Sequence, residues 1–178
     1  MSPNSFAQAQ RILKRASSLV QRASFAAMGR AMSHAKTVLG KEIRSEYAIK
    51  ARRARSAITA KRVKTSGSTQ AEILVRGGNL LASEFSLRPK TDTTGGRRKA
   101  VRLGIRKGGV QRVDKGFVSR GVLLRRKGSK SYPIEPVFGP AVPGMAANEH
   151  VVDAVQSDFK ETYERRLEHE ISRLMNKG

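Results

Sequence analysis

The chain has 178 residues and no cysteine, and its 36 Lys and Arg against 14 Asp and Glu give a formal net charge of +22. This length fits one domain, the missing cysteines exclude disulfides and thiolate metal sites, and no segment approaches the ~20 apolar residues of a membrane span. Ordinary small domains need a net charge of only about 2–8, so the excess favours a polyanion or an acidic protein surface as neighbour.

The charge is unevenly distributed along the chain. Residues 1–148 carry 31 Lys and Arg and 7 Asp and Glu, whereas residues 149–178 carry 5 and 7. The C-terminal segment is therefore electrostatically distinct from the rest. We predict a single domain over residues 1–178, with a helical region at 5–44, a basic β-rich region at 45–147 and a C-terminal helix at 148–176.

The N-terminal region shows helical periodicity. Apolar residues recur at spacings of three and four from Ser5, a plausible N-cap, to about Ala35; they are Ile12, Ala16, Leu19, Ala23 and Ala26. A second helical stretch, Met32–Ile43, is expected to break at Gly40. A short basic helix over Ser45–Arg55 follows, capped by its first residue.

The middle of the chain has the pattern of short strands. Ala57–Thr65 and Gln70–Arg76 flank a Gly/Ser turn and predict a hairpin. Arg98–Arg106 alternates basic with apolar residues, which indicates a strand with one buried and one charged face. Phe117–Val118 and Val122–Arg125 are two further strand candidates. The loop between the second and third of these strands, Pro89–Gly96, has no predicted structure.

A proline-rich segment from Lys130 to Pro143 joins the basic region to the last helix, and it holds four of the six prolines. Because each proline fixes φ and extends the residue before it, we predict a stiff extended segment rather than a helix. Tyr132 and Ile134 are expected to face the core from a last strand. The structural residues proposed here are Tyr132, Pro133, Ile134, Pro140 and Pro143, the last two setting the exit angle of the C-terminal helix.

The C-terminal helix carries the clearest periodic signal, with Asn148 as its N-cap. Its apolar stripe is Val152, Val155, Phe159, Tyr163, Leu167, Ile171 and Leu174. An acidic ridge, Glu161, Glu164 and Glu168, is interpreted as a solvated face. The stripe can cover the sheet, pack beside the N-terminal helix, or pair with a copy of itself. The predicted class is α+β: an N-terminal helix, a small, mostly antiparallel twisted sheet, and a long C-terminal helix packed on the sheet.

No catalytic or cofactor pattern is present in the sequence. The three histidines, His34, His150 and His169, lack the spacing of metal ligands. Gly128–Ser131 resembles only the end of a phosphate-binding loop. We therefore predict that the protein is not an enzyme and has no cofactor or metal.

The basic segments carry the main functional signal. Between Arg88 and Lys130 there are 15 Lys and Arg and 2 acids, interleaved with glycines whose backbone N–H groups can approach phosphates. Aromatic residues for base stacking are scarce, so contact is expected with the DNA backbone, without sequence specificity, or with an acidic protein; both remain open. The candidate contact residues are Arg52, Arg53, Arg55, Arg97, Arg98, Lys99, Arg102, Arg106, Lys107, Arg125, Arg126, Lys127 and Lys130.

Several motifs in order resemble the tail completion proteins of tailed bacteriophages, the minor tail protein Z family. They follow the Ala-rich N-terminal helix and precede a long last helix, over about residues 5–176. The motifs are Tyr47–Ile58, Ala71–Leu81, Gly116–Val118, Ser131–Val137 and Gly139–Pro143. The Pro89–Gly96 loop has no counterpart in this pattern.

The resemblance implies a structural virion protein at the head-proximal end of the tail, where the tail meets the neck. Its implied partners are the tail terminator, the tail tube and the head–tail connector, and its implied form is a homo-oligomeric ring of six copies around the DNA channel. Synthesis in the host cytoplasm follows, with no membrane association. The alternative is a nucleic-acid-binding protein without sequence specificity, such as a ribosome-associated or DNA-packaging factor.

Overall fold

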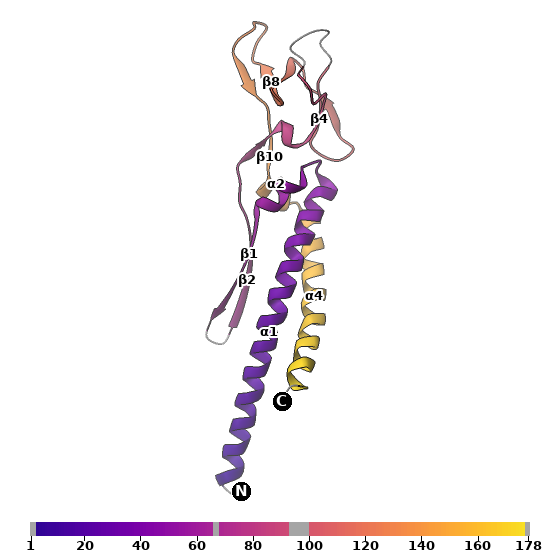
Figure 1. The fold of residues 1–178 in the computed structure, drawn as a ribbon. Coiled ribbons are helices and arrows are strands. Elements are labelled where there is room, and N and C mark those ends of the chain that lie inside the picture. Colours follow the sequence, from indigo (N-terminus) through magenta and orange to yellow (C-terminus); the bar gives the residue numbers. More distant parts are fainter. Residues whose placement is uncertain (1–2, 66–67, 93–99, 177–178) are drawn as a thin grey trace. The chain divides into compact units, whose positions relative to one another are not determined.

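The computed structural model of the chain describes residues 3–65, 68–92 and 100–176. Long helices and small antiparallel sheets build the fold, which confirms the predicted α+β class (Figure 1). The chain divides into two compact units: a helical unit of Met1–Val38, Thr59–Leu74 and Val155–Gly178, and a sheet unit of Leu39–Ile58 and Val75–Ala154. A single domain over residues 1–178 stays a prediction.

The helices are α1 (Pro3–Glu46), α2 (Ala51–Ser56), α3 (Val142–Ala146) and α4 (Glu149–Met175), with a 3₁₀ turn at Ala82–Glu84. The strands are β1 (Ile58–Thr65), β2 (Ser68–Val75), β3 (Asn79–Leu81), β4 (Ser86–Arg88), β5 (Arg102–Gly104), β6 (Val110–Arg112), β7 (Gly116–Ser119), β8 (Val122–Arg126), β9 (Ile134–Pro136) and β10 (Phe138–Ala141). Within the described residues they form four small sheets: β1–β2, β10–β3, β4–β5–β6 and β7–β8–β9. No helix in the described ranges combines the length and apolar character needed to cross a membrane.

The first helix is longer than the sequence predicts. α1 runs without a break from Pro3 to Glu46, so the expected break at Gly40 is wrong. One glycine costs a helix only about 1 kcal/mol relative to alanine, and Gly40 is buried against Ile58, so packing offsets this cost. Ser45 lies inside α1, where its hydroxyl donates to the Glu42 carbonyl oxygen at 2.6 Å, and the next helix begins only at Ala51. The predicted cap at Ser45 is therefore wrong as well.

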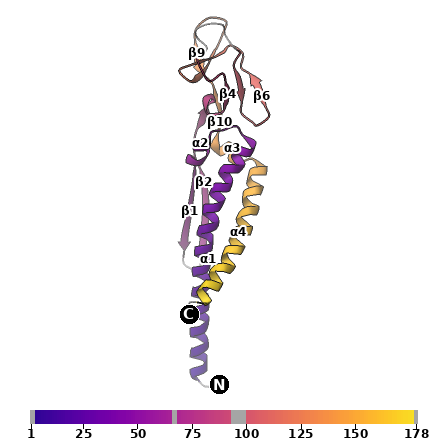
Figure 2. The same ribbon diagram turned by 45° about the vertical axis from the view of Figure 1, so that its right-hand side comes forward.

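Alanines on α1 determine how the helical unit packs. Ala23, Ala27, Ala31 and Ala35 follow one another at i, i+4 spacing, and each is 0% exposed. Residues four apart share one face of a helix, and small side chains let a neighbouring helix approach closely. Figures 1 and 2 show α4 beside this part of α1, running in the opposite direction. The contact includes a 2.9 Å hydrogen bond between the Ser24 and Tyr163 hydroxyls.

The second long helix begins as predicted. The Asn148 side chain accepts a hydrogen bond from the His150 backbone N–H at 3.1 Å, which is the geometry of an N-cap. The apolar stripe of α4 is only half-buried within the helical unit. The fully buried positions there are polar: Thr162 is 5% exposed and Glu170 is 0% exposed.

Glu170 is a buried carboxylate held by two arginines. Its Oε2 accepts a hydrogen bond from Nε of Arg173 at 2.8 Å and forms an ion pair with Nη2 of the same side chain at 2.7 Å, and its Oε1 lies 3.3 Å from Nη2 of Arg30 on α1. The hydrogen bond from Arg173 lowers the pKa of Glu170 below its ordinary value, against the opposing effect of burial. A buried charge persists only when it is paired, so this cluster connects α4 to α1.

The Glu170 cluster predicts a dependence of stability on pH. Because the pKa is lower in the folded chain, the carboxylate stabilises the fold fully above its ordinary pKa of 4.5, and this contribution is lost as the pH falls through the lowered value. Glu170→Gln should therefore flatten the acid side of a plot of unfolding free energy against pH. The exposed Glu161→Gln is the matched control, and an equal effect in both variants would contradict the assignment.

In the sheet unit, turn chemistry and prolines define the strands. β7 and β8 are joined by a two-residue turn at Arg120–Gly121, where both residues have positive φ (50° and 76°) as tight hairpins require. β10 pairs with β3, and its register shifts between Gly139 and Ala141. Pro140 lies at this irregularity because it has no N–H to donate to a ladder.

The proline-rich segment differs from its prediction in two ways. Tyr132 is 75% exposed, so the expectation that it faces the core is wrong, whereas Ile134 is half-buried in β9. The segment is also not extended throughout, because Val142 starts the short helix α3 with Pro143 in its first turn. Proline is well tolerated there, since the first N–H groups of a helix have no intrahelical acceptor.

The core of the sheet unit packs closely around Phe85. Phe85 is 4% exposed, and a Cβ added at buried Gly139 would lie 2.5 Å from its ring. Glycine at this position is thus required by the approach of the strand to the ring.

Gly139→Ala should destabilise the chain by about 1–3 kcal/mol, the usual cost of overpacking a core. Gly78→Ala is the control, because a Cβ at Gly78 meets nothing within 4 Å. Urea unfolding followed by circular dichroism measures both. Equal midpoints for the two variants would show that Phe85 moves aside without cost.

Candidate anion-binding surface

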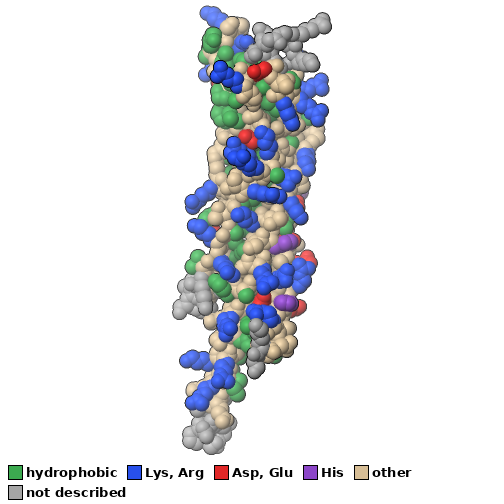
Figure 3. Space-filling view, in the orientation of Figure 1, with side chains coloured by type: hydrophobic (Ala, Val, Ile, Leu, Met, Phe, Trp, Pro, Cys, Tyr) green, Lys and Arg blue, Asp and Glu red, His purple; other side chains and the backbone are tan. Residues whose placement is uncertain are grey.

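Of the predicted contact residues, ten lie in the sheet unit within the described residues, and Arg97, Arg98 and Lys99 lie outside the described residues. Lys and Arg side chains are spread over the face shown in Figure 3, and Asp and Glu are few. The ten residues differ in what they touch. Those whose side chains form no ion pair with any described residue are Arg52, Arg55, Arg102, Arg106, Lys107, Arg126, Lys127 and Lys130.

Two of the predicted contact residues, Arg53 and Arg125, already form ion pairs with carboxylates of the same chain. Arg53 Nη2 lies 3.2 Å from Glu84 Oε1, and Lys50 Nζ lies 3.3 Å from Oε2 of the same carboxylate. Burial raises the pKa of Glu84, but hydrogen bonds from Arg53 and Lys50 outweigh this effect and lower it. Arg125 donates to Glu135 across β8 and β9 at 2.9 Å. Arg53 and Arg125 therefore stabilise the sheet unit through these ion pairs, which leaves them less available to bind a partner.

Two other predicted contact residues, Arg106 and Arg126, have their guanidinium groups over aromatic rings. The Arg106 guanidinium is 5.7 Å from the centre of the Tyr47 ring, and that of Arg126 is 4.6 Å from the centre of the Phe117 ring. Cation–π contacts of this kind fix a guanidinium in place while leaving its N–H groups available. Phe117, one of the few aromatic residues of this region, thus lies under an arginine.

A row of arginines crosses the three-stranded sheet β4–β5–β6. Arg88 on β4 is the register partner of Arg102 on β5, and Arg102 is the partner of Arg112 on β6. All three side chains are exposed. Directly opposed residues on antiparallel strands have Cβ atoms about 4.5–5.5 Å apart, so three cations are held side by side on one face.

Among the described residues, one ion pair involves a member of this row. Asp114 Oδ1 is 3.6 Å from Arg112 Nε, and both side chains are highly exposed, so the pair contributes little. Like charges directly opposite one another destabilise a sheet. An anion lying across the row would remove this repulsion, which makes the arginine row the best candidate for a phosphate or carboxylate site.

The sequence pointed to only one member of the row. Arg102 lies in the predicted basic–apolar alternation. Arg112 could have been found, because the Gly108–Gly109 turn pairs β5 with β6. Arg88 could not, since its pairing with Arg102 joins segments on either side of residues 93–99.

A second, smaller basic site lies at the turn after β8. A pocket of about 290 Å³ is lined by Lys115 and Arg126 together with Gly128, Ser129 and Ser131. Two cations and two hydroxyls suit an anion, but the pocket lacks the helix N-terminus of a nucleotide-binding loop. It therefore extends the basic surface rather than forming a nucleotide site.

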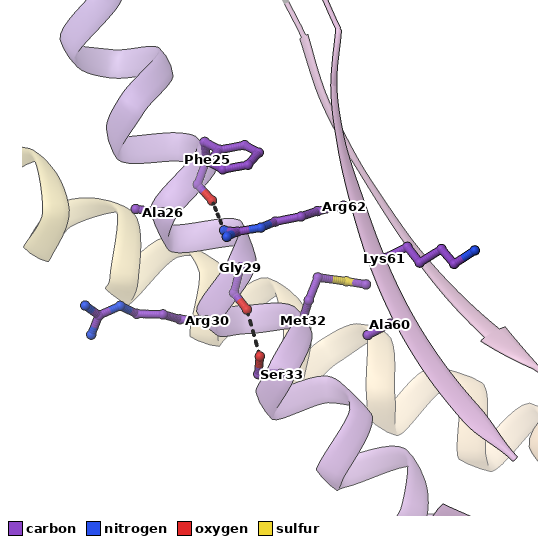
Figure 4. Close-up of a pocket in the computed structure, with 9 residues that line it drawn as sticks. All are labelled: Phe25, Ala26, Gly29, Arg30, Met32, Ser33, Ala60, Lys61 and Arg62. Atoms are coloured by element: carbon purple, nitrogen blue, oxygen red, sulfur yellow. Dashed lines mark hydrogen bonds between the residues drawn. The ribbon is translucent and has the colours of Figure 1, made fainter. Parts of the chain in front are cut away.

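The pocket in Figure 4, in the helical unit, has no catalytic chemistry among its lining residues. Arg62 on β1 reaches across it, donates to the Phe25 carbonyl oxygen at 2.9 Å and lies 4.2 Å from the centre of the Phe25 ring. Gly29 allows this, since a Cβ there would collide with the guanidinium. The Ser33 hydroxyl donates to the Gly29 carbonyl oxygen. The pocket is thus a packing site where the hairpin meets α1.

Repulsion within the arginine row can be measured. Arg102→Gln should raise the unfolding free energy by about 0.2–1 kcal/mol for each of its two neighbours at low salt, and the gain should shrink as salt screens the charges. Arg52→Gln removes the same charge from α2, where no strand partner exists, and serves as the control. A loss of stability in Arg102→Gln, or a gain that does not depend on salt, would contradict the prediction.

Residues 6–177 match the family model described as prophage minor tail protein Z (GPZ). Neither curated proteins nor solved structures gave a match. The family match spans both units, including the arginine row, and confirms the resemblance drawn from the sequence motifs. The chain therefore belongs to the prophage minor tail protein Z family and is a structural protein of a bacteriophage tail.

Proposed function

We propose that this protein completes the tail at its head-proximal end and makes the tail competent to join a DNA-filled head. The family membership supports a tail component that interacts with other tail proteins. The observation that carries the finer proposal is the arginine row Arg88–Arg102–Arg112, an exposed cationic surface with little internal neutralisation. Such a surface suits a position next to DNA or next to an acidic neck protein.

Several copies are expected to act together in a ring around the DNA channel, with the tail terminator, tail tube and head–tail connector as neighbours. The exposed basic residues of the sheet unit would then face the channel or the adjoining ring. Contact with DNA in this arrangement uses the phosphate backbone, because aromatic residues that could stack on bases are scarce in the basic region of the sequence. The structural role in the family also favours a protein without enzymatic activity.

The proposal is tested in a phage that carries this gene. Deleting the gene should yield DNA-filled heads and full-length tails that stay separate in electron micrographs, and the wild-type gene supplied in trans should restore joined particles. An antibody label should mark the head-proximal end of purified tails. Joined particles without the protein, or a label along the tube or at the distal tip, would contradict the proposal.

The arginine row gives a sharper version of the same test. The triple variant Arg88→Gln, Arg102→Gln and Arg112→Gln should fold, since it removes repulsion, yet should restore far fewer joined particles than wild type. A triple variant at exposed lysines of the helical unit, Lys36→Gln, Lys61→Gln and Lys160→Gln, is the control for net charge. Equal rescue by both variants would exclude the row from head–tail joining.

Binding of nucleic acid without sequence specificity is the second candidate, favoured by the same unneutralised arginines. Each phosphate contact adds about 0.9 to the slope of log binding constant against log salt for duplex DNA. Tight binding of the purified chain with a slope of several units, lowered in the row variant, would favour this function. Weak binding would favour an acidic protein partner.

The segment Pro140–Pro143, called the proline corner here, provides a test of the proposed role in assembly. Val142 and Met145 on α3 are buried, with Pro140 and Pro143 on either side of Val142. Replacing both prolines with Gly should loosen the start of α4 through added chain entropy and impair assembly more than DNA binding. Unchanged assembly in the double variant would count against a structural role for this corner.

A further inference from the structure

The first turns of α1 present an apolar face that no described residue covers. Ile12 is 67% exposed, Leu13 69% and Val20 50%. Figures 1 and 2 show the reason: within the helical unit, the N-terminal part of α1 extends past the C-terminal end of α4. Large apolar side chains grouped on one helix face mark an interaction surface.

The same segment has a basic edge and no acidic residue. Arg11, Arg15 and Arg22 follow helical spacing beside the apolar face, and the first acid of the chain is Glu42. The three arginines are exposed and form no ion pair with another described residue. The partner of this segment should therefore combine an apolar strip with carboxylates.

The α4 helix offers a surface of that kind. Glu161, Glu164 and Glu168 are exposed at spacings of three and four, on the side of α4 opposite the buried Thr162 and Glu170, and they also lack ion pairs with described residues. Ile171, half-buried, lies next to this ridge on the helix surface. The ridge thus has exposed carboxylates bordered by the half-buried Ile171.

Within one chain, α1 and α4 already pair in this manner. Arg30 contacts Glu170 at 3.3 Å, and His34 Nδ1 lies 2.8 Å from Asp158 Oδ2. The basic helix and the acidic helix are therefore complementary where they meet. Each copy retains an unpaired basic surface at the start of α1 and an unpaired acidic surface on the outer face of α4.

We propose that residues 8–22 of α1 in one copy dock on the Glu161–Glu164–Glu168 ridge of α4 in a second copy. The contact joins two different surfaces, so every copy has one donor surface and one acceptor surface left to use, and a closed ring results if the rotation between copies closes. A symmetric contact between two α1 segments is disfavoured, because it would place the four cations of residues 8–22, which include no acid, against an identical set.

This inference rests on the proposed ring of copies and specifies the surfaces that form it. Charge pairs at an interface set register and partner choice, while the apolar face supplies the buried area. The contact therefore requires both Ile12 with Leu13 and the three arginines, and it should weaken as salt rises.

The experiment uses the full chain and two matched variants. The arm variant carries Arg11→Glu and Arg15→Glu, and the ridge variant carries Glu161→Lys and Glu164→Lys. Sedimentation velocity over a concentration series should show oligomers for wild type. For each variant alone, the concentration for half-assembly should rise about tenfold or more, the change expected from losing and then opposing two charge pairs.

Mixing the two variants is the decisive step. The reversed arm of one variant matches the reversed ridge of the other, and the unchanged arm matches the unchanged ridge, so an equimolar mixture should reassemble at wild-type concentrations. Far-ultraviolet circular dichroism confirms that each variant folds. Lys36→Glu with Lys61→Glu, the same charge change at exposed positions of the helical unit outside both proposed surfaces, is the control and should assemble like wild type.

Each other outcome contradicts the contact. If both variants formed oligomers at the same concentrations as wild type, this interface would be overturned, but the proposal of a ring would remain. A wild-type chain that stays monomeric, or that assembles only when another tail protein is added, would overturn self-association, whereas the gene-deletion test of tail completion would be unaffected. Failure of the mixture to reassemble would show that the two surfaces do not meet.

Discussion

The scarcity of carboxylates is the constraint on which the arrangement of this protein depends. With 14 Asp and Glu for 36 Lys and Arg, the chain cannot neutralise its own charge. The structure places acids where the fold needs them most: Glu84 between Lys50 and Arg53, Glu135 against Arg125, and Glu170 between Arg30 and Arg173. Each of these carboxylates has a lowered pKa, because its cationic neighbours favour the charged form.

Two groups of the remaining cations stand out from the basic side chains spread over the surface. In the sheet unit, Arg88, Arg102 and Arg112 stand opposite one another across three strands, an arrangement that costs stability unless an anion is present. In the helical unit, Arg11, Arg15 and Arg22 border the uncovered apolar face of α1. A chain with these two unsatisfied surfaces is suited to an assembly, where neighbouring subunits or DNA supply the missing negative charge.

Membership in the prophage minor tail protein Z family gives these surfaces a setting. A tail protein works among other subunits, and partners can bury surface that the isolated chain exposes. The small core agrees with this, since α1 is packed mainly through alanines and the apolar stripe of α4 is only half-buried. Stability in the virion is then expected to depend partly on contacts between subunits.

The sequence by itself determined the features that arise from local rules: the existence of the two long helices, the Asn148 cap, the β1–β2 hairpin, the β7 and β8 strands and the excess of positive charge. Helical spacing, capping and turn residues act over a few positions, so they can be read directly. Only the tertiary structure decided that α1 continues through Gly40, that Tyr132 is exposed, that Glu170 is buried and that Arg88 lies beside Arg102. These four depend on which distant segments pack together, and packing and strand register between distant segments leave no periodic mark in the sequence.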